Sequence, residues 1–272
     1  MIEEGIYKEL SNDDYHKDKA IGSSGIKAFK EIPALYEWEY LKGNKKERTP
    51  AMELGSAMHS FLLEPGLYHK EYKVSTLTNR RGNAWQDFVA ECEAEQKKPI
   101  LQKDFEALEN MRTSLFKNTL CAKVLNAPGE YECSFFHKDE ATGLRTKSRP
   151  DKLSQGILID LKTTEVSLGA SAYSRTAYNL SRQLQAYHHK NVVEKVTGET
   201  IDAVWHIVVS LKKPHLSRIF NVPMDWLEMG KNQVEMLLGE IAKCEENKHY
   251  PGYDEDTPVD LILPAWAGNE IN

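Results

Sequence analysis

The chain has 272 residues, of which 40% are hydrophobic and 28% are charged, and its formal net charge is −6. These values are ordinary for a globular protein of one domain, and no run approaches the ~20 apolar residues of a membrane span. The acidic balance argues against a basic, nonspecific nucleic-acid coat protein, but it allows an enzyme with one local positive groove.

The N-terminus and the cysteines bear on the compartment. The first residues, MIEEGIYKEL, are acidic rather than basic and then apolar, so we expect no signal peptide. The cysteines form no CxxC pair, which favours reduced thiols and argues against a zinc or iron–sulfur site. They are Cys92, Cys121, Cys133 and Cys244. We therefore expect a cytoplasmic protein without a membrane segment.

The first half of the chain is expected to be helical. Apolar spacing and turn residues place helices at residues 22–41, 51–64, 84–97 and 103–126. Pro33 breaks or restarts the first of these helices. Thr49 is the expected cap of the second helix, Pro50 opens it, and Pro65 ends it.

The second half mixes strands and helices. Alternation over residues 129–164, with turn signals at 141–143 and 154–156, predicts a three-stranded meander. A helix near 178–196 that ends at Gly198, strands at 202–211 and 215–222, and a helix at 224–247 follow. We therefore expect an α/β or α+β fold in which helices flank a mixed central sheet.

One domain is expected to span residues 1–272. Within it we expect an N-terminal helical segment at 1–50, a catalytic core at 51–250 and an irregular, proline-rich tail at 251–272.

The strand GILIDLKTTE, at residues 156–165, carries two charges. Its apolar residues Ile157, Ile159 and Leu161 point to one side. Asp160 and Lys162 point to the other side, ~7 Å apart along the strand. Asp151 precedes them by about one hairpin, so two carboxylates lie on adjacent strands, where repulsion raises a pKa. A divalent cation that accepts oxygen ligands from both would relieve this repulsion.

This arrangement predicts metal-assisted phosphodiester hydrolysis. A bound metal acts as a Lewis acid on the phosphoryl oxygen and lowers the pKa of the attacking water. Lys162 is then placed to orient or deprotonate that water, or to stabilise developing negative charge.

The spacing of Asp151 and the triplet 160–162 resembles the signature of the PD-(D/E)xK nucleases, and Pro150 preserves its Pro-Asp pair. His59 follows Gly55 on a helix, which is similar to the Gly-x-x-x-His helix of the RecB-like branch, whose histidine gives a nitrogen to the metal.

Two more elements resemble that branch. Glu132 lies on the strand before the Pro-Asp pair, where these nucleases place a glutamate near the metal or its water, and Glu130 is the competing candidate. Gln183 and Tyr187 share one helix face and resemble the Gln-x-x-x-Tyr motif, which positions the DNA or the active-site strand.

The resemblance implies a set of site residues. The catalytic set is Asp151, Asp160, Lys162, Glu132, Gln183 and Tyr187. A Mg²⁺ ion, with Mn²⁺ as a substitute, would be held by His59, Asp151, Asp160 and the backbone carbonyl of Leu161.

Most of the chain resembles the RecE-type exonucleases, the family of exonuclease VIII. The segments that carry this resemblance begin GIYKELSNDDYHKDKAIGSSGIKAFK and AMELGSAMHSFLLEPGLYHKEY. It implies a metal-dependent exonuclease that degrades one strand of linear double-stranded DNA from the 5′ end. The 3′ single strand would serve homologous recombination through a RecT-type annealing protein, and the nuclease would form a ring-shaped homo-oligomer, a tetramer in RecE.

Six basic residues are candidates for phosphate contacts: Arg80, Arg81, Arg145, Lys147, Arg149 and Lys152. Arg149 and Lys152 are the stronger candidates because they lie next to Asp151. Three alternatives stay open at this point. They are an endonuclease of the same superfamily, a catalytically silent DNA-binding protein and a metal hydrolase of a smaller phosphoester.

Overall fold

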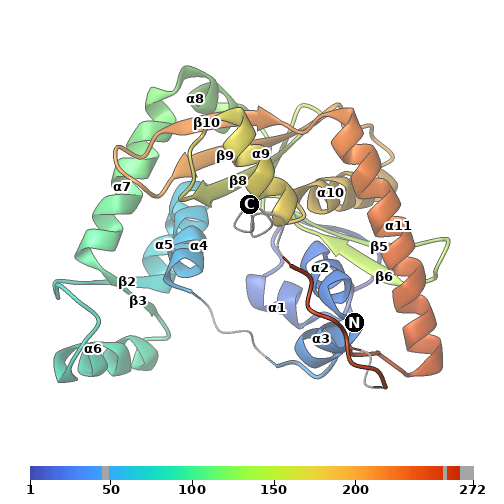
Figure 1. Cartoon of the computed structure of the whole chain (residues 1–272). Helices are drawn as coiled ribbons and strands as arrows, with labels where there is room; N and C mark the ends of the chain where they lie inside the picture. Colours follow the sequence, from blue (N-terminus) through green and yellow to red (C-terminus); the bar gives the residue numbers. More distant parts are fainter. Residues whose placement is uncertain (45–48, 254–255, 264–272) are drawn as a thin grey trace, which may run out of the picture.

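The computed structural model describes residues 1–44, 49–253 and 256–263. A mixed sheet in the order β10–β9–β8–β7–β4 lies at its centre (Figure 1). Its strands are β4 (Glu130–Tyr131), β7 (Lys152–Ser154), β8 (Ile157–Thr164), β9 (Ala203–Ser210) and β10 (Ser217–Asn221). β8 and β9 are parallel, and the other neighbours are antiparallel. The predicted α/β fold class with a mixed central sheet is confirmed.

Helices cover both faces of the central sheet. One face packs on α4 (Pro50–Leu63), α7 (Gln102–Lys117) and α8 (Thr119–Asn126), and the other on α9 (Ala170–Asn179), α10 (Arg182–Thr197) and α11 (Met224–Asn247). Ile157, Ile159 and Leu161 of β8 point into the first core, as their alternation predicts. Leu158 points into the second core, so Asp160 and Lys162 lie on the face that α10 covers.

A second sheet, in the order β1–β5–β6, lies beside the first. Its strands are β1 (Gly5–Tyr7), β5 (Ser134–Lys138) and β6 (Arg145–Ser148). The predicted three-stranded meander is therefore wrong, because the hairpins β5–β6 and β7–β8 belong to different sheets. Pro150 lies between them and has no N–H for strand pairing, which separates β6 from β7.

The N-terminal helices pack near this second sheet. They are α1 (Asn12–Lys17), α2 (Ser23–Glu31) and α3 (Pro33–Tyr36), followed by a π-helical turn (Glu37–Leu41). Pro33 is the first residue of α3, so it restarts the helix rather than ending it.

A small β-α-β lobe projects from the body next to α4 (Figure 1). It contains α5 (Pro65–Glu71), β2 (Tyr72–Ser75), α6 (Asn83–Ala94) and β3 (Lys98–Leu101). β2 and β3 are parallel, and α6 lies in the connection between them. The two short strands were not predicted. The helix predicted to stop at Pro65 ends just before it, at Leu63, and Pro65 also opens α5 from its first turn.

Local capping signals account for several helix ends. The side chain of Thr49 accepts a hydrogen bond from the first turn of α4, as predicted. The predicted helix at 103–126 is divided at Asn118, whose side chain caps α8. Ser181, in the left-handed region at φ 51°, separates α9 from α10, and Gly198 ends α10 at φ 72°.

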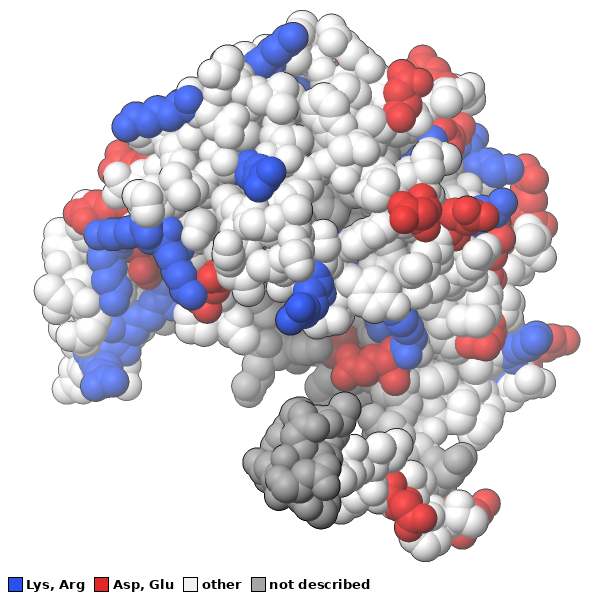
Figure 2. Space-filling model, turned by 45° about the horizontal axis from the view of Figure 1, so that its top comes forward, with Lys and Arg blue, Asp and Glu red and all other residues white. Residues whose placement is uncertain are grey.

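Charged side chains are unevenly distributed over the face shown in Figure 2. Most Lys and Arg atoms lie on its left half, the side of α7 and the β-α-β lobe, and most Asp and Glu atoms lie on its right half, the side of α11. A net charge of −6 therefore coexists with a locally basic surface.

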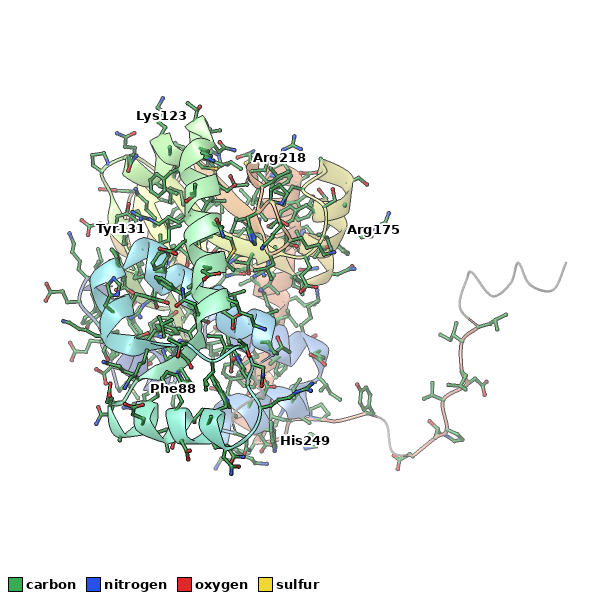
Figure 3. The ribbon with its side chains drawn as sticks, turned by 90° about the vertical axis from the view of Figure 1, so that its left-hand side faces the viewer. Phe88, Lys123, Tyr131, Arg175, Arg218 and His249 are labelled. Atoms are coloured by element: carbon green, nitrogen blue, oxygen red, sulfur yellow. The ribbon has the colours of Figure 1, made fainter. Side chains whose placement is uncertain are left out.

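Two further predictions concern membrane-spanning helices and the C-terminal tail. No described helix combines the length and apolarity that crossing a bilayer requires. The described parts of the tail, 251–253 and 256–263, contain no helix or strand and extend away from the body beyond His249 (Figure 3). The remainder of the predicted irregular tail, 254–255 and 264–272, lies outside the described residues.

Candidate active site

A cavity of about 500 Å³ lies between α4 and the N-terminal segment. Four predicted site residues line it: His59, Glu132, Arg149 and Asp151. We call it the His59 cavity. Other charged residues in its wall are Lys8, Glu9, Glu64, Glu71 and Lys98. None of these five was predicted from the sequence as a site residue.

Asp151 lies between β6 and β7, and its side chain binds the backbone of β8 at the point where the pairing of β7 with β8 has ended. β7 pairs with β8 only as far as Ile159, so the backbone of Leu161 has no strand partner on that side. The carboxylate of Asp151 accepts a hydrogen bond from the Leu161 N–H, and its Oδ2 lies 3.1 Å from His59 Nε2. The N–H and C=O of one strand residue point the same way. The Leu161 carbonyl therefore lies at the edge that carries Asp151 and His59.

His59 is held from both sides of its ring. Nδ1 donates to the carbonyl of Gly55 at 2.8 Å, which leaves Nε2 for Asp151. A Cβ at position 55 would lie 3.1 Å from Thr163 Oγ1, so glycine lets α4 approach β8 closely. Burial alone lowers the pKa of His59, but the Asp151 carboxylate outweighs burial and raises the pKa to about 9. A metal ion at Nε2 would therefore displace a proton.

Glu132 faces the cavity from a strained position. Its φ of 47° lies in the left-handed region, which is uncommon for a residue other than glycine. Burial, reinforced by the charge of Asp151, raises the pKa of Glu132 to about 8. Glu130, the competing candidate, pairs with Lys8 at 2.8 Å, and its side chain is 48% exposed. The structure thus places Glu132 rather than Glu130 beside Asp151.

Asp160 and Lys162 form a buried ion pair on β8, with 2.7 Å between Oδ2 and Nζ. Burial raises the pKa of Asp160, but Lys162 outweighs burial and holds the pKa well below its usual value. His206 of β9 lies beside the pair, with Nε2 4.0 Å from Asp160 Oδ2. Asp160 is not among the residues that line the His59 cavity.

The predicted metal ligands are therefore assembled in part. The structure brings His59, Asp151 and the Leu161 backbone together, whereas Asp160 contacts Lys162. In the part of the chain that the structure describes, no three His, Cys, Asp or Glu side chains converge closely enough to hold a metal ion.

The chemistry of this donor set nevertheless fits a hard divalent cation. Carboxylate and carbonyl oxygens are the ligands that Mg²⁺ prefers, and Mn²⁺ suits the same donors and also accepts imidazole nitrogen. Burial is the main cause of the raised pKa of Glu132, and the charge of Asp151, which a bound cation would offset, is the next. The assignment of His59, Asp151, Asp160 and the Leu161 carbonyl as ligands stays a prediction.

Gln183 and Tyr187 lie on the face of α10 that packs against α11. Gln183 is fully buried, and its Nε2 donates to Gln233 of α11 at 3.2 Å. A Cβ at Gly230 of α11 would clash with the Gln183 carbonyl and approach Tyr187. The close contact with α11 therefore keeps both residues away from the His59 cavity.

Gln185 and His189 form a second i, i+4 pair on α10, and His189 of this pair interacts with Asp160. The Oε1 of Gln185 accepts from Lys27 at 3.1 Å and from Arg182 at 2.9 Å, and its Nε2 lies 3.3 Å from His189 Nε2. Burial lowers the pKa of His189 to about 4, although Asp160 opposes this shift. Gln185 and His189 have the same i, i+4 spacing as Gln183 and Tyr187. This spacing was the only feature of the sequence that could have pointed to Gln185 and His189 as site residues.

Comparisons with known proteins agree with this geometry. Residues 22–258 match the family described as "PDDEXK-like domain of unknown function (DUF3799)". The chain belongs to this family. No curated protein matches the chain in sequence.

Two solved structures are similar to the chain. One is a protein from Eubacterium rectale with the name "putative exonuclease", at 14% identity and a TM-score of 0.65, which covers 95% of this chain and 97% of that chain. The other is SSO0001, at 15% identity and a TM-score of 0.29, with 71% of this chain and 86% of that chain covered. The PD-(D/E)xK nuclease prediction is confirmed, while the narrower RecE-type assignment stays a prediction.

Within this PD-(D/E)xK fold, the six basic candidates differ in position. Lys152 lies at the C-terminal end of α8 and is fully buried. Because it is buried, it cannot contact a phosphate. Its Nζ donates to the carbonyls of Val124, Leu125 and Ala127 and to the hydroxyl of Tyr131, at 2.6–3.0 Å.

Three other candidates are also engaged in structural contacts. Lys147 donates to the carbonyls of Tyr15 and Asp18 from a buried position. Arg145 contacts the Asp18 carboxylate at 3.2 Å. Arg80 pairs with Glu53 and Asp104. All three hold segments of the chain together.

The two remaining candidates are Arg149, which also makes structural contacts but lines the cavity, and Arg81. Arg149 lines the His59 cavity, lies 4.2 Å from the Tyr15 ring centroid and donates to Ser134 Oγ at 2.7 Å. Arg81 is exposed in the loop before α6. Of the two stronger candidates, only Arg149 therefore borders the candidate site.

Proposed function

We propose that this chain is a divalent-metal-dependent exodeoxyribonuclease that degrades one strand of linear double-stranded DNA in the 5′→3′ direction. The observation that carries the proposal is the edge of β8, where Asp151, His59 and the Leu161 backbone meet next to the Asp160–Lys162 pair. The similarity of fold to the E. rectale protein with the exonuclease name supports the choice of exonuclease.

The residues divide the work as follows. A bound Mg²⁺ or Mn²⁺ supplies Lewis acidity and activates water. His59, Asp151 and Glu132 present nitrogen and oxygen donors from one cavity wall. Lys162 provides a positive charge for the phosphate or for the attacking water. Asp160 fixes the position of Lys162 through their 2.7 Å contact.

The proposal extends to the substrate and partners. DNA ends would enter along the side on which Lys and Arg gather (Figure 2), and phosphate contacts would make affinity fall with salt. The product, a 3′ single strand, would pass to a RecT-type annealing protein for homologous recombination. A ring-shaped homo-oligomer would surround the duplex with its basic side.

The decisive experiment compares linear duplex DNA, labelled differently at its 5′ and 3′ ends, with covalently closed circular DNA in Mg²⁺. The wild type should degrade only the linear DNA and release the 5′ label first. Asp160→Ala should abolish cleavage, whereas Glu130→Ala, which removes an exposed carboxylate, should leave it unchanged.

Each other outcome has a defined meaning. Cutting of the closed circle would identify an endonuclease. Cleavage of neither DNA by the wild type would favour a DNA-binding protein. Retention of Mg²⁺-dependent activity in Asp160→Ala would remove Asp160 from the site.

A further inference from the structure

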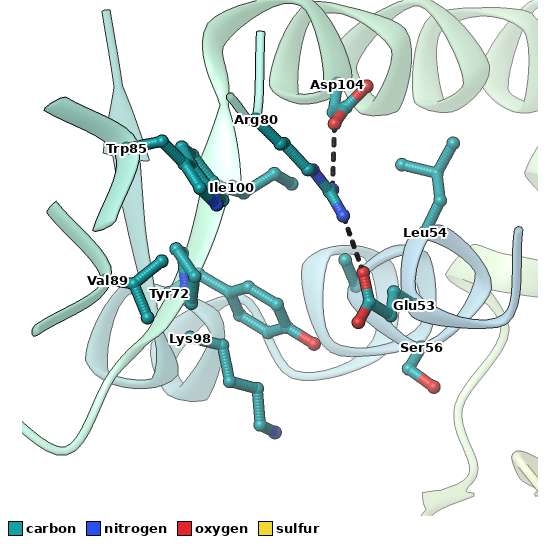
Figure 4. A pocket seen from close by; sticks show the side chains of 12 residues that line it. Glu53, Leu54, Ser56, Tyr72, Arg80, Trp85, Val89, Lys98, Ile100 and Asp104 are labelled. Carbon is teal, nitrogen blue, oxygen red and sulfur yellow. Dashed lines mark hydrogen bonds and ion pairs between the residues drawn. The ribbon is translucent and has the colours of Figure 1, made fainter. Parts of the chain in front are cut away.

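A second cavity lies between α4 and the β-α-β lobe. Its volume is about 460 Å³, and it shares three wall residues with the His59 cavity: Ser56, Tyr72 and Lys98. The two cavities therefore adjoin along α4 and the start of β2. We call the second one the Trp85 pocket, after the tryptophan of α6 that lines it (Figure 4).

The Trp85 pocket combines aromatic rings with fixed charges. Trp85 and Tyr72 stand on the lobe side, opposite residues of α4 (Figure 4). Arg80 lies 5.7 Å from the Trp85 ring centroid, and Lys98 lies 5.3 Å from that of Tyr72. The rest of the wall holds the polar residues Glu53, Ser56 and Asp104 and the apolar residues Leu54, Ala57, Val89, Pro99 and Ile100.

Arg80 neutralises much of the acidic charge of this pocket. It donates to Glu53 of α4 at 2.7 Å and to Asp104 of α7 at 3.1 Å (Figure 4). The two carboxylates therefore face the pocket as hydrogen-bonded partners of a guanidinium rather than as bare charges. Such a wall repels a polyanion less than unpaired carboxylates would.

We propose that the Trp85 pocket binds an unpaired nucleobase of the DNA strand whose phosphates lie in the His59 cavity. The inference rests on the proposed function, because it requires a DNA strand in the adjoining cavity. Every base has a π-face that stacks on an aromatic side chain with little sequence preference. The volume is within the range of small-molecule sites, and the lining has the required mixture of rings and polar groups.

This assignment gives the lobe a task in the nuclease. An enzyme that acts at a DNA end must hold the separated strand while its phosphates reach the metal site. A stacked base next to the His59 cavity would keep that strand out of the duplex. Stacking is worth on the order of 1–3 kcal/mol per base by alanine substitution, which corresponds to roughly 5- to 150-fold in affinity.

The first test changes the DNA and leaves the pocket intact. The probe is a forked duplex with two short unpaired arms, in which either arm carries normal or abasic nucleotides. Its affinity for the Asp160→Ala protein is measured by fluorescence anisotropy in Mg²⁺. Abasic nucleotides in one arm should weaken binding about 5- to 150-fold. Equal affinity for all forks would overturn the proposal.

The second test changes the ring in the same Asp160→Ala background. Trp85→Ala should bind normal and abasic forks equally, whereas Trp85→Phe, which keeps a ring, should still distinguish them. Trp38→Ala is the matched control, because Trp38 is 46% exposed and lies outside both cavities. A Trp85→Ala protein that still prefers the normal fork would overturn the assignment.

The two proposals can fail separately. Absence of cleavage by the wild type would overturn the proposed function, while base-dependent binding through Trp85 would still support the pocket. Conversely, an active nuclease that binds normal and abasic forks equally would overturn the pocket assignment alone.

Discussion

Two buried lysines ten positions apart show how differently this fold treats a buried positive charge. Lys152 of β7 donates to three carbonyls and a hydroxyl, and none of the carboxylates that the structure describes contacts it. Lys162 of β8 contacts the carboxylate of Asp160 at 2.7 Å. The first lysine caps a helix, where the partial negative charge of the C-terminus favours a cation. The second lies beside the edge that Asp151 and His59 share.

The two neighbouring glutamates differ in the same way. Glu130 has an exposed partner in Lys8, whereas Glu132 is strained at φ 47° and has a pKa raised to about 8. A buried charge with a complete set of partners stabilises the fold. A charge held near like charge, in a strained backbone, points to a functional site.

The largest effect expected from this comparison is on stability. Lys152→Met would remove the ammonium donor from three carbonyls at the end of α8, of which only that of Leu125 keeps a second donor among the described residues, the Tyr131 hydroxyl. We therefore expect the free energy of unfolding to fall by about 3–5 kcal/mol. Thermal unfolding should show a Tm lower by roughly 10 °C. The cleavage rate per folded molecule should not change well below that temperature.

Lys123 of α8 provides the control for this prediction. Its side chain points outward at the top of the view in Figure 3 and is exposed, so Lys123→Met should cost less than about 1 kcal/mol. If Lys152→Met were as stable as Lys123→Met but inactive, Lys152 would belong to the active site after all.

The second effect is on the chemical step. Lys162→Arg keeps a positive charge opposite Asp160 but replaces a compact ammonium with a planar guanidinium. We expect the single-turnover cleavage rate to fall about 10²-fold, with Tm nearly unchanged. The Mg²⁺ concentration that gives half-maximal rate should also stay nearly the same, because Lys162 is not a ligand. A loss of metal affinity as large as the loss of rate would contradict this role.

The strand that carries Lys162 was predictable because its signals are local. Alternation places Ile157, Ile159 and Leu161 on one face and the charged pair on the other, whatever surrounds the strand. The start of α4 was predictable for a similar reason, since Thr49 caps the helix through its own first turn.

The orientation of α10 was not predictable in this way. Helices and strands pack on several sides of it, and Leu184 belongs to one core whereas Val193 belongs to another. Gln183 and Gln185 are therefore equivalent in the sequence, and only the close approach of Gly230 in α11 decides which of them is enclosed. Lys152 and Arg149 lie close to Asp151 in the sequence, and the sequence does not distinguish them either. In the structure Lys152 is buried, whereas Arg149 lines the His59 cavity.

The smallest of the three effects concerns Glu132. It best distinguishes a residue of the active site from a residue that only stabilises the fold. Its pKa is raised from 4.5 to about 8, so between these pH values the folded protein keeps a proton that the unfolded chain has lost. The unfolded state then binds fewer protons, and the free energy of unfolding falls as pH rises through this window. After a discount for partial exposure, we expect a loss of roughly 2–3 kcal/mol in metal-free buffer.

Glu132→Gln cannot titrate, so urea unfolding between pH 4.5 and 8 should lose this component of the slope, whereas Glu130→Gln should keep it. At pH 8 without metal, Glu132→Gln should therefore be more stable than the wild type and yet cleave DNA more slowly. Mg²⁺ should stabilise the wild type more than this variant, because a bound cation replaces the proton that the carboxylate otherwise retains. Identical pH slopes for the wild type and Glu132→Gln would show that Glu132 is an ordinary surface carboxylate like Glu130.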